Sequence, residues 1–116
     1  MSKTVLHALL IEDKAEDVRL IEAALARAIR EGYLIKRVTS LSEALAVLGR
    51  TSFAIILLDL ELPDAQGVAV VQQVARAAAN TPIVILSSAE NEDVSRLAEQ
   101  DGGDDYFVKA LPDRRP

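Results

Sequence analysis

The stretch IILLDLELPD, residues 55–64, contains the segment around which the fold is built. Ile55 to Leu58 are four consecutive apolar residues, which predicts a short β-strand buried on both faces. The run ends at Asp59, whose charged carboxylate is costly to bury, and two more acidic residues, Glu61 and Asp64, follow closely. We therefore expect a group near Asp59 that offsets this cost.

The overall composition indicates one small α/β domain. Of the 116 residues, 50% are apolar and only 3% aromatic, and such aliphatic side chains suit helices packed on a sheet. The net charge of -5 argues against nucleic acid as a direct partner. The chain has no cysteine, and no apolar run approaches the roughly 18 residues of a membrane span. We expect a cytoplasmic protein that binds neither nucleic acid nor membranes.

Five apolar runs have the length of a β-strand and lack the polar alternation of a sheet with one exposed face. They are residues 6–11, 34–38, 53–58, 82–86 and 106–108. Between them, apolar residues recur every three or four positions, which predicts helices through residues 18–29, 41–48, 68–78 and 94–98. Gly32 is expected to end the first helix, and Ser40 with Glu43 forms a capping-box pair at the start of the second. This alternation predicts a doubly wound parallel sheet with helices on both faces.

In such a sheet, ligands bind beyond the carboxyl ends of the strands. The polar residues that end or follow strands there are Glu12, Asp13, Asp59, Ser87, Ser88 and Lys109. Neighbouring strands lie about 4.8 Å apart, so the carboxylates would crowd and repel one another. A hard cation such as Mg²⁺, which prefers oxygen ligands, would relieve the repulsion and offset the burial of Asp59.

Carboxylates, Mg²⁺, a hydroxyl and a lysine are the groups that phosphoryl transfer uses. Asp59 would attack phosphorus, while the metal ion and Lys109 would neutralise phosphoryl oxygens. The Ser87 hydroxyl would donate a hydrogen bond to the transferred group. The product would be an aspartyl phosphate.

Simpler structural roles fit several of these residues. Asp13 and Glu16 are spaced as a capping pair for the first helix, and the two serines could be ordinary strand-end hydroxyls. Lys109 could be a solvated lysine. Asp64 is expected only to form a turn, with Gly67 supplying backbone freedom.

The motifs LLIED, ILLDLELPDAQG, PIVILSS and DDYFVK, in this order, resemble the receiver domain of two-component response regulators. The resemblance extends from about Leu6 to Lys109 and implies a flavodoxin-like, five-stranded sheet with strand order 2-1-3-4-5. It implies that Asp59 accepts the phosphoryl group from a histidine kinase or a histidine phosphotransfer protein. Phosphorylation would then switch a surface that contacts other proteins.

The resemblance also implies the remaining site residues. Mg²⁺ would be bound by Glu12, Asp13, Asp59 and the backbone carbonyl of Glu61. Ser87 would be the switch hydroxyl, which the family register favours over its neighbour. Tyr106 and Lys109 would be the switch aromatic and the phosphate-binding lysine.

The sequence departs from this family in two respects. The family's lysine-proline pair is here Lys109-Ala110, so we expect an ordinary trans peptide after the fifth strand. The receiver domain would occupy residues 1–109, and residues 110–116 would form a short irregular tail in place of a fifth helix. The apolar strip left beside the first helix would invite a homodimer or another partner.

Two other functions are alternatives to a phosphoacceptor module. A pseudo-receiver would keep the fold but serve only for interaction or dimerisation. A phosphohydrolase of the haloacid dehalogenase type would also use an aspartate nucleophile, but that family carries DxD after its first strand. Here the acceptor follows the third strand, and Glu61 stands at the second acidic position. The phosphoacceptor is not expected to be an enzyme beyond its own phosphorylation and dephosphorylation.

Overall fold

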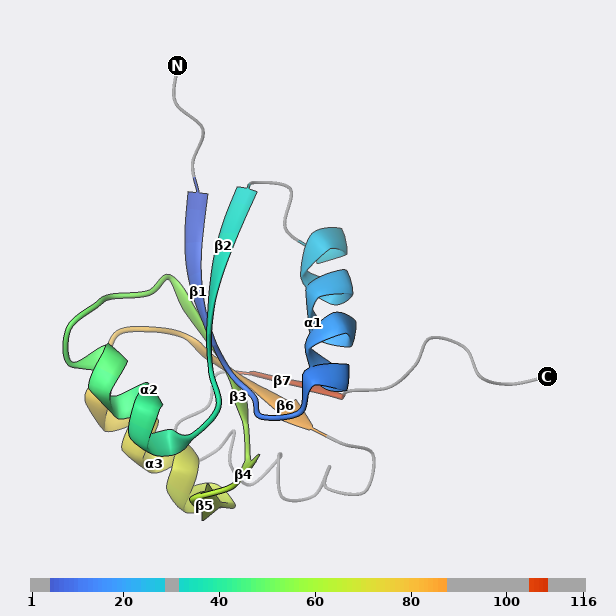
Figure 1. The fold of residues 1–116 in the computed structure, drawn as a ribbon. Coiled ribbons are helices and arrows are strands. Elements are labelled where there is room, and N and C mark those ends of the chain that lie inside the picture. Colours follow the sequence, from blue (N-terminus) through green and yellow to red (C-terminus); the bar gives the residue numbers. More distant parts are fainter. Residues whose placement is uncertain (1–4, 29–31, 88–104, 109–116) are drawn as a thin grey trace.

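The computed structural model describes residues 5–28, 32–87 and 105–108, and its core is a five-stranded parallel sheet (Figure 1). The sheet order is β2-β1-β3-β6-β7. These strands are β2 (Gly32–Val38), β1 (Val5–Ile11), β3 (Ile55–Asp59), β6 (Ile83–Ser87) and β7 (Asp105–Val108). The predicted order is confirmed, because β6 and β7 are the fourth and fifth strands of the prediction.

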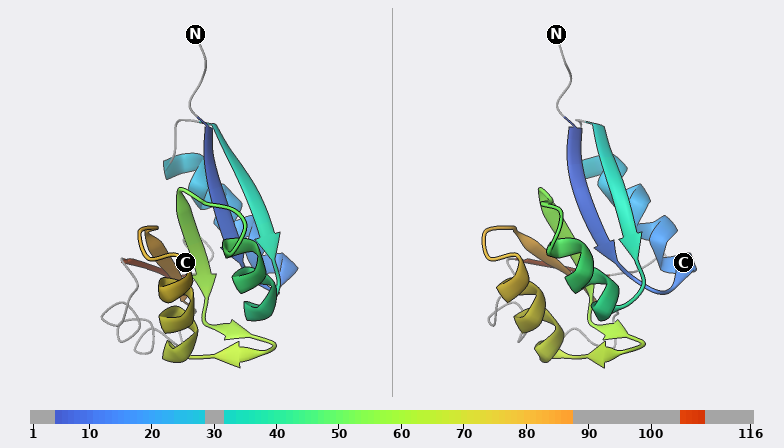
Figure 2. Two further views of the ribbon diagram at one scale, coloured as in Figure 1. Left: turned by 90° about the vertical axis from the view of Figure 1, so that its left-hand side faces the viewer. Right: turned by 60° about the vertical axis from the view of Figure 1, so that its left-hand side comes forward.

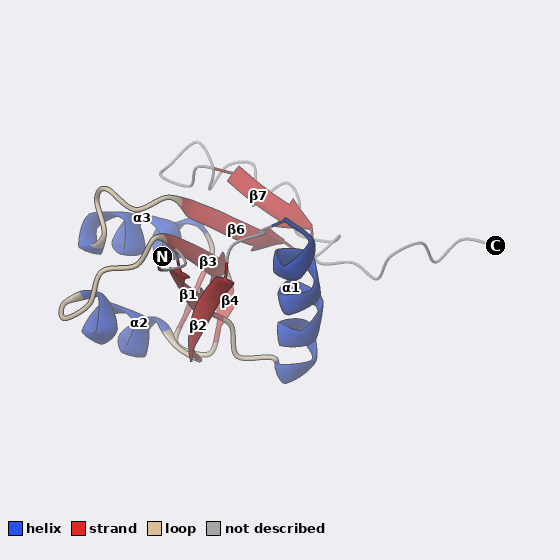
Figure 3. Ribbon diagram, turned by 90° about the horizontal axis from the view of Figure 1, so that it is seen from above, coloured by secondary structure: helices blue, strands red, loops and turns tan. Residues whose placement is uncertain are grey.

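Helices cover both faces of the sheet, as predicted. Helix α1 (Ala15–Ala28) lies on one face, and α2 (Leu41–Leu48) and α3 (Val68–Ala77) lie together on the other (Figure 3). The predicted fourth helix and the tail at 110–116 lie outside the described residues.

The central strand β3 is apolar from Ile55 to Leu58, and each of its faces meets a helical layer. Ile56 and Leu58 are fully buried in the cluster that includes α2 and α3. Leu57, between them, belongs to the second cluster, which contains Ile21 and Leu25 of α1. Successive side chains of a strand point to opposite faces, so one continuous apolar run supplies both layers.

Some predicted boundaries and helix faces were wrong in detail. Gly32, expected to end the first helix, is instead the first residue of β2 and pairs with Val5 of β1. The parallel ladder with β1 therefore extends the strand beyond the apolar run that predicted it. Further along, periodicity predicts that α2 and α3 bury Leu41, Ala44, Leu45 and Leu48, and Val68, Val71, Ala75 and Ala78. The most buried positions of these helices also include three residues outside those sets, Val47, Val70 and Val74. Periodicity identifies a helix, but its packing partner decides which side is buried.

A small antiparallel hairpin between β3 and α3 was not predicted. It consists of β4 (Glu61–Leu62) and β5 (Ala65–Gln66) and lies near the ends of α2 and α3 (Figure 2). Asp64, at its tip, was expected only to form a turn. Its two carboxylate oxygens also accept hydrogen bonds from the backbone N–H groups of Leu41 and Ser42, both at 2.9 Å. This carboxylate therefore joins the hairpin to the first turn of α2, where helix N–H groups need acceptors.

The predicted capping pair at α2 is present in a modified form. The Ser40 hydroxyl accepts a hydrogen bond from the N–H of Glu43 at 3.1 Å. The Glu43 carboxylate accepts from the N–H of Thr39 at 2.8 Å, one residue before the cap. The hydrogen bonds from Thr39 lower the pKa of Glu43, and those from Leu41 and Ser42 lower the pKa of Asp64.

Gly67 is required by its backbone conformation. It precedes α3 with φ of 81° and ψ of -159°, a region that residues other than glycine rarely adopt.

A Cβ atom at position 67 would meet nothing within 4 Å, so backbone strain alone should make Gly67→Ala destabilising by about 1–3 kcal/mol. Gly49→Ala is the matched control, because Gly49 has ordinary helical dihedrals and room for a methyl group. It should be neutral or slightly stabilising. Urea unfolding of both variants measures the difference, and equal effects would contradict this account.

Asp64 should stabilise the fold in a pH-dependent manner. Because its pKa is lowered on folding, its contribution is present above the ordinary value of 3.8 and is lost as pH falls through the lower folded pKa. Asp64→Ala should therefore unfold at lower urea concentration than the wild type at neutral pH, and the two should converge in acid. Glu43 titrates in both proteins, and because its pKa is lowered mainly by the hydrogen bonds from Thr39, it contributes little to the difference between them. Glu16→Gln, which removes an exposed acidic charge from α1, should show no such convergence. A constant difference at all pH values would refute a role for the Asp64 charge.

Candidate functional site

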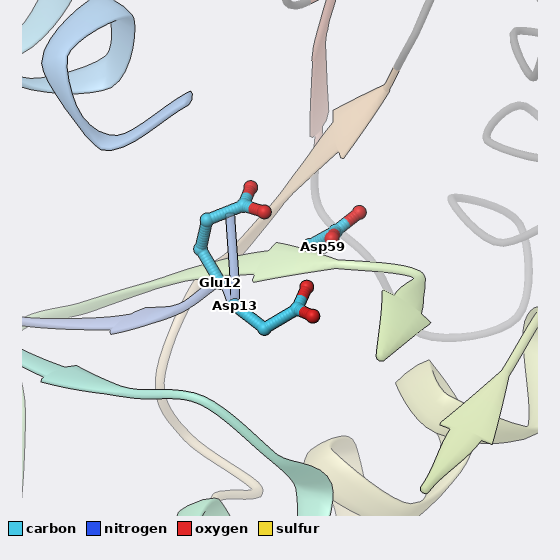
Figure 4. Close-up of side chains that lie close together, drawn as sticks. All are labelled: Glu12, Asp13 and Asp59. Carbon is cyan, nitrogen blue, oxygen red and sulfur yellow. The ribbon is translucent and has the colours of Figure 1, made fainter. Parts of the chain in front are cut away.

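Three carboxylates meet at the carboxyl edge of the sheet. Glu12 and Asp13 follow β1, and Asp59 is the last residue of β3. These strands are direct neighbours, with Ile11 opposite Leu58. One carboxylate oxygen from each acidic residue lies within 4.8 Å of the other two (Figure 4).

Two of the three carboxylates are removed from solvent. Glu12 is 0% and Asp59 3% exposed, whereas Asp13 is exposed. The N–H of Lys14 donates to Oε2 of Glu12 at 3.2 Å, and the N–H of Glu61 donates to Oδ1 of Asp59 at 3.2 Å. In both cases a backbone amide two residues further along the chain orients the acidic side chain. These hydrogen bonds offset part of the cost of burying charge.

The two loops that carry the carboxylates are also joined at their surface. Nζ of Lys14 lies 3.7 Å from Oε1 of Glu61, and both side chains are nearly half exposed. An ion pair as exposed as this one contributes at most about 1 kcal/mol. It links the loop after β1 to the residue that begins β4.

The donor set of this cluster fits a hard divalent cation. Its three described donors are all carboxylate oxygens, which Mg²⁺ and Ca²⁺ prefer to softer ligands. Two of the donors are buried, and close carboxylates repel each other when charged. A bound cation would remove that repulsion and offset the cost of burying the charged carboxylate of Asp59.

The structure places Asp13 relative to helix α1 and Ser87 relative to the sheet. Helix α1 begins at Ala15, so Lys14, and not Asp13, is the residue immediately before it. Whether Asp13 also caps α1 stays a prediction, but its carboxylate lies in the cluster with Glu12 and Asp59. Ser87 ends β6, the strand beside β3, and its pairing places it opposite Val108.

Several predicted site residues cannot be located as side chains. The side chains of Ser87 and Tyr106, together with Ser88 and Lys109, lie outside the described residues. Tyr106 is placed only as a position in β7, opposite Ile85.

Sequence reasoning missed Arg37 entirely. This exposed residue of β2 donates from Nε to the backbone carbonyl of Glu12 at 2.9 Å. Residues 12 and 37 are far apart in the chain, and a single arginine in a short strand carries no pattern that would mark it. Only the pairing of β1 with β2 brings them together.

No helix in the described part of the chain combines the length and the apolarity needed to cross a lipid bilayer.

The sequence of this chain matches a known protein family and individual relatives. The family model described as response regulator receiver domain matches residues 8–115. The cell cycle transcriptional regulator CtrA of Caulobacter vibrioides is 37% identical over 105 residues, which are 90% of this chain and 44% of CtrA. The chain thus spans less than half of the length of this relative.

Solved structures show the same fold. The phosphorylated cyanobacterial phytochrome response regulator RcpA matches with a TM-score of 0.78 and 28% identity, covering 94% of this chain and 84% of RcpA. The receiver domain of the sensor histidine kinase PA1611 from Pseudomonas aeruginosa matches with a TM-score of 0.74 and 24% identity, covering 93% and 88%. That structure is described as having a magnesium ion coordinated in its active-site cleft.

The carboxylate cluster should make stability depend on divalent cations. At a Mg²⁺ concentration 100 times the dissociation constant, the folded protein should gain about 2.7 kcal/mol, and a chelator should reverse the gain. Asp13→Asn should lose most of this response, because it removes one charged ligand oxygen. Without metal it should be no less stable than the wild type, since it also removes repulsion. Thermal unfolding with and without Mg²⁺ tests this, with Glu16→Gln as the charge-matched control. A full response in Asp13→Asn would exclude this site.

Proposed function

The chain belongs to the response regulator receiver domain family, and from that premise we propose that Asp59 is its phosphoacceptor. Members of this family are signalling modules of two-component systems and not classical enzymes. Histidine kinases phosphorylate response regulators in such systems. For this chain the donor is a histidine kinase or a histidine phosphotransfer protein.

The observation that carries this proposal is the cluster formed by Asp59 with Glu12 and Asp13. Asp59 is the acidic residue at the tip of the central strand β3, where the sheet order changes direction. Ligands of doubly wound sheets bind at such a point. The N–H of Glu61 holds one oxygen of the Asp59 carboxylate. The other two acidic side chains lie close enough for all three to share one ion.

Magnesium is the proposed cofactor. Glu12, Asp13, Asp59 and the backbone carbonyl of Glu61 would hold it, and when bound it supplies positive charge beside the phosphoryl oxygens. Oxygen ligands of this type, and the small number of them, suit Mg²⁺.

The transfer itself requires little from the protein beyond position and charge. A carboxylate oxygen of Asp59 forms a bond to the phosphorus of a phosphohistidine, and the bond from phosphorus to the imidazole nitrogen breaks. The imidazole keeps the electron pair and takes a proton from solvent. The product on this chain is an acyl phosphate.

The remaining roles follow from the family resemblance. The Ser87 hydroxyl would donate to the new phosphoryl group, and the Lys109 ammonium would pair with one of its oxygens. Tyr106 would move with Ser87 and alter the exposed surface. A new charged group at Asp59 thereby biases the protein between two arrangements. Proteins that bind this surface would respond to the change, and we propose that the module acts in the cytoplasm.

Phosphorylation should occur once and at Asp59. Incubation with Mg²⁺ and acetyl phosphate should add the mass of one phosphoryl group, and Asp59→Ala should abolish the addition. Asp64→Asn is the control, because it alters another carboxylate of the same loop without touching the cluster. An unchanged intact mass for the wild type would favour the pseudo-receiver. Sustained turnover of a small phosphomonoester would favour the phosphohydrolase.

A further inference from the structure

The Arg37 side chain donates a hydrogen bond to Glu12, the first of the three clustered acidic residues along the chain. Its Nε donates to the backbone carbonyl of Glu12 at 2.9 Å, and the N–H of Glu12 donates to the carbonyl of Val38 at 3.0 Å. Both backbone groups of Glu12 are thus held by the last two residues of β2. Glu12 itself lies one position beyond the end of β1.

The Arg37 side chain replaces a backbone hydrogen bond that would form if the parallel ladder between β1 and β2 continued beyond Ile11 and Val38. In a parallel ladder with Ile11 opposite Val38, the carbonyl of Glu12 would next accept from the N–H of Ser40. Ser40 has already left the strand and serves as the N-cap of α2. The Arg37 side chain supplies an N–H donor to the same carbonyl.

The bonded carbonyl belongs to the peptide that joins the two acidic residues. A peptide unit is planar from one Cα to the next, so holding the oxygen of Glu12 also fixes the Cα of Asp13. Glu12 and Asp13 contribute two of the three clustered carboxylates. The orientation of this one peptide therefore affects both side chains at once.

We infer that Arg37 is a positioning residue for the divalent cation, acting through the peptide between Glu12 and Asp13. The inference rests on the proposed function, because it concerns the same metal site. Residues that orient metal ligands without touching the metal commonly change affinity by about 10–100-fold when removed. Arg37 is exposed, so we expect a smaller effect, a loss of about 3–10-fold in Mg²⁺ affinity.

The positive charge of Arg37, considered alone, predicts the opposite change in Mg²⁺ affinity. Arg37 is a cation close to a cation site, so removing its charge would by itself strengthen Mg²⁺ binding. A positioning role predicts that binding weakens when the donor is lost. The sign of the change therefore separates the two.

The experiment compares Arg37→Met with Arg37→Gln. Both remove the charge, but the side-chain amide of glutamine has a nitrogen at the same distance along the chain as Nε of arginine. Arg37→Gln should therefore keep Mg²⁺ affinity close to that of the wild type, and Arg37→Met should lose about 3–10-fold. Lys36→Met, which removes the neighbouring exposed charge of β2, should cause no loss. Calorimetric titration with Mg²⁺ measures all four proteins.

A second readout needs no metal. Hydrogen exchange of the Lys14 amide, which is bonded to the Glu12 carboxylate, should be faster in metal-free Arg37→Met than in Arg37→Gln. If Arg37→Met does not fold, Arg37→Glu replaces it, since glutamate cannot donate and its added negative charge would otherwise favour Mg²⁺. Equal affinities and equal exchange in the donor and non-donor variants would overturn the inference. Failure of the wild type to bind Mg²⁺ would instead overturn the proposed cofactor.

Discussion

The burial of charged carboxylates at the tips of two neighbouring strands is the constraint on which the rest of this protein depends. Glu12 and Asp59 are almost completely removed from water, at the carboxyl edge of a sheet whose central strand β3 is otherwise apolar. Such a position is unfavourable for a charged group unless hydrogen bonds or an opposite charge compensate. The backbone amides of Lys14 and Glu61 supply part of that compensation. A divalent cation bound by the crowded oxygens would supply the rest.

The sheet makes this arrangement possible because it is covered on both faces. The residues of β3 feed two separate apolar clusters, one with α1 and one with α2 and α3. The acidic end of this apolar run favours one register, since a shift of one residue would move the charged Asp59 into the place of the fully buried Leu58. A fixed register then sets the separation between Asp59 and the pair after β1. The apolar core thus determines the geometry of a polar site that it does not contain.

Polar contacts at the start of α2 connect the carboxyl edge of the sheet to the hairpin that follows β3. The strand β2 ends at Val38 and the chain turns at once into α2, whose first amides bond to Ser40 and Asp64. Asp64 belongs to the hairpin that follows Asp59, and Arg37 reaches back to Glu12. The loops on both sides of the carboxylate cluster are therefore tied to the junction between β2 and α2. A change of charge at Asp59, as we propose, would therefore act on a connected set of loops.

The chain's own sequence determined the fold class, the strand order through its resemblance, and the clustering of Glu12, Asp13 and Asp59. Long apolar runs and helical periodicity are local signals, and parallel strands must bring their carboxyl ends to one edge. Tertiary structure alone decided the role of Gly32 in β2, the buried faces of α2 and α3, and the contacts of Arg37 and Asp64. Each of these depends on a partner distant in the chain, such as Val5 for Gly32 or Leu41 for Asp64. No local pattern specifies such a partner, because it is chosen by how the elements pack.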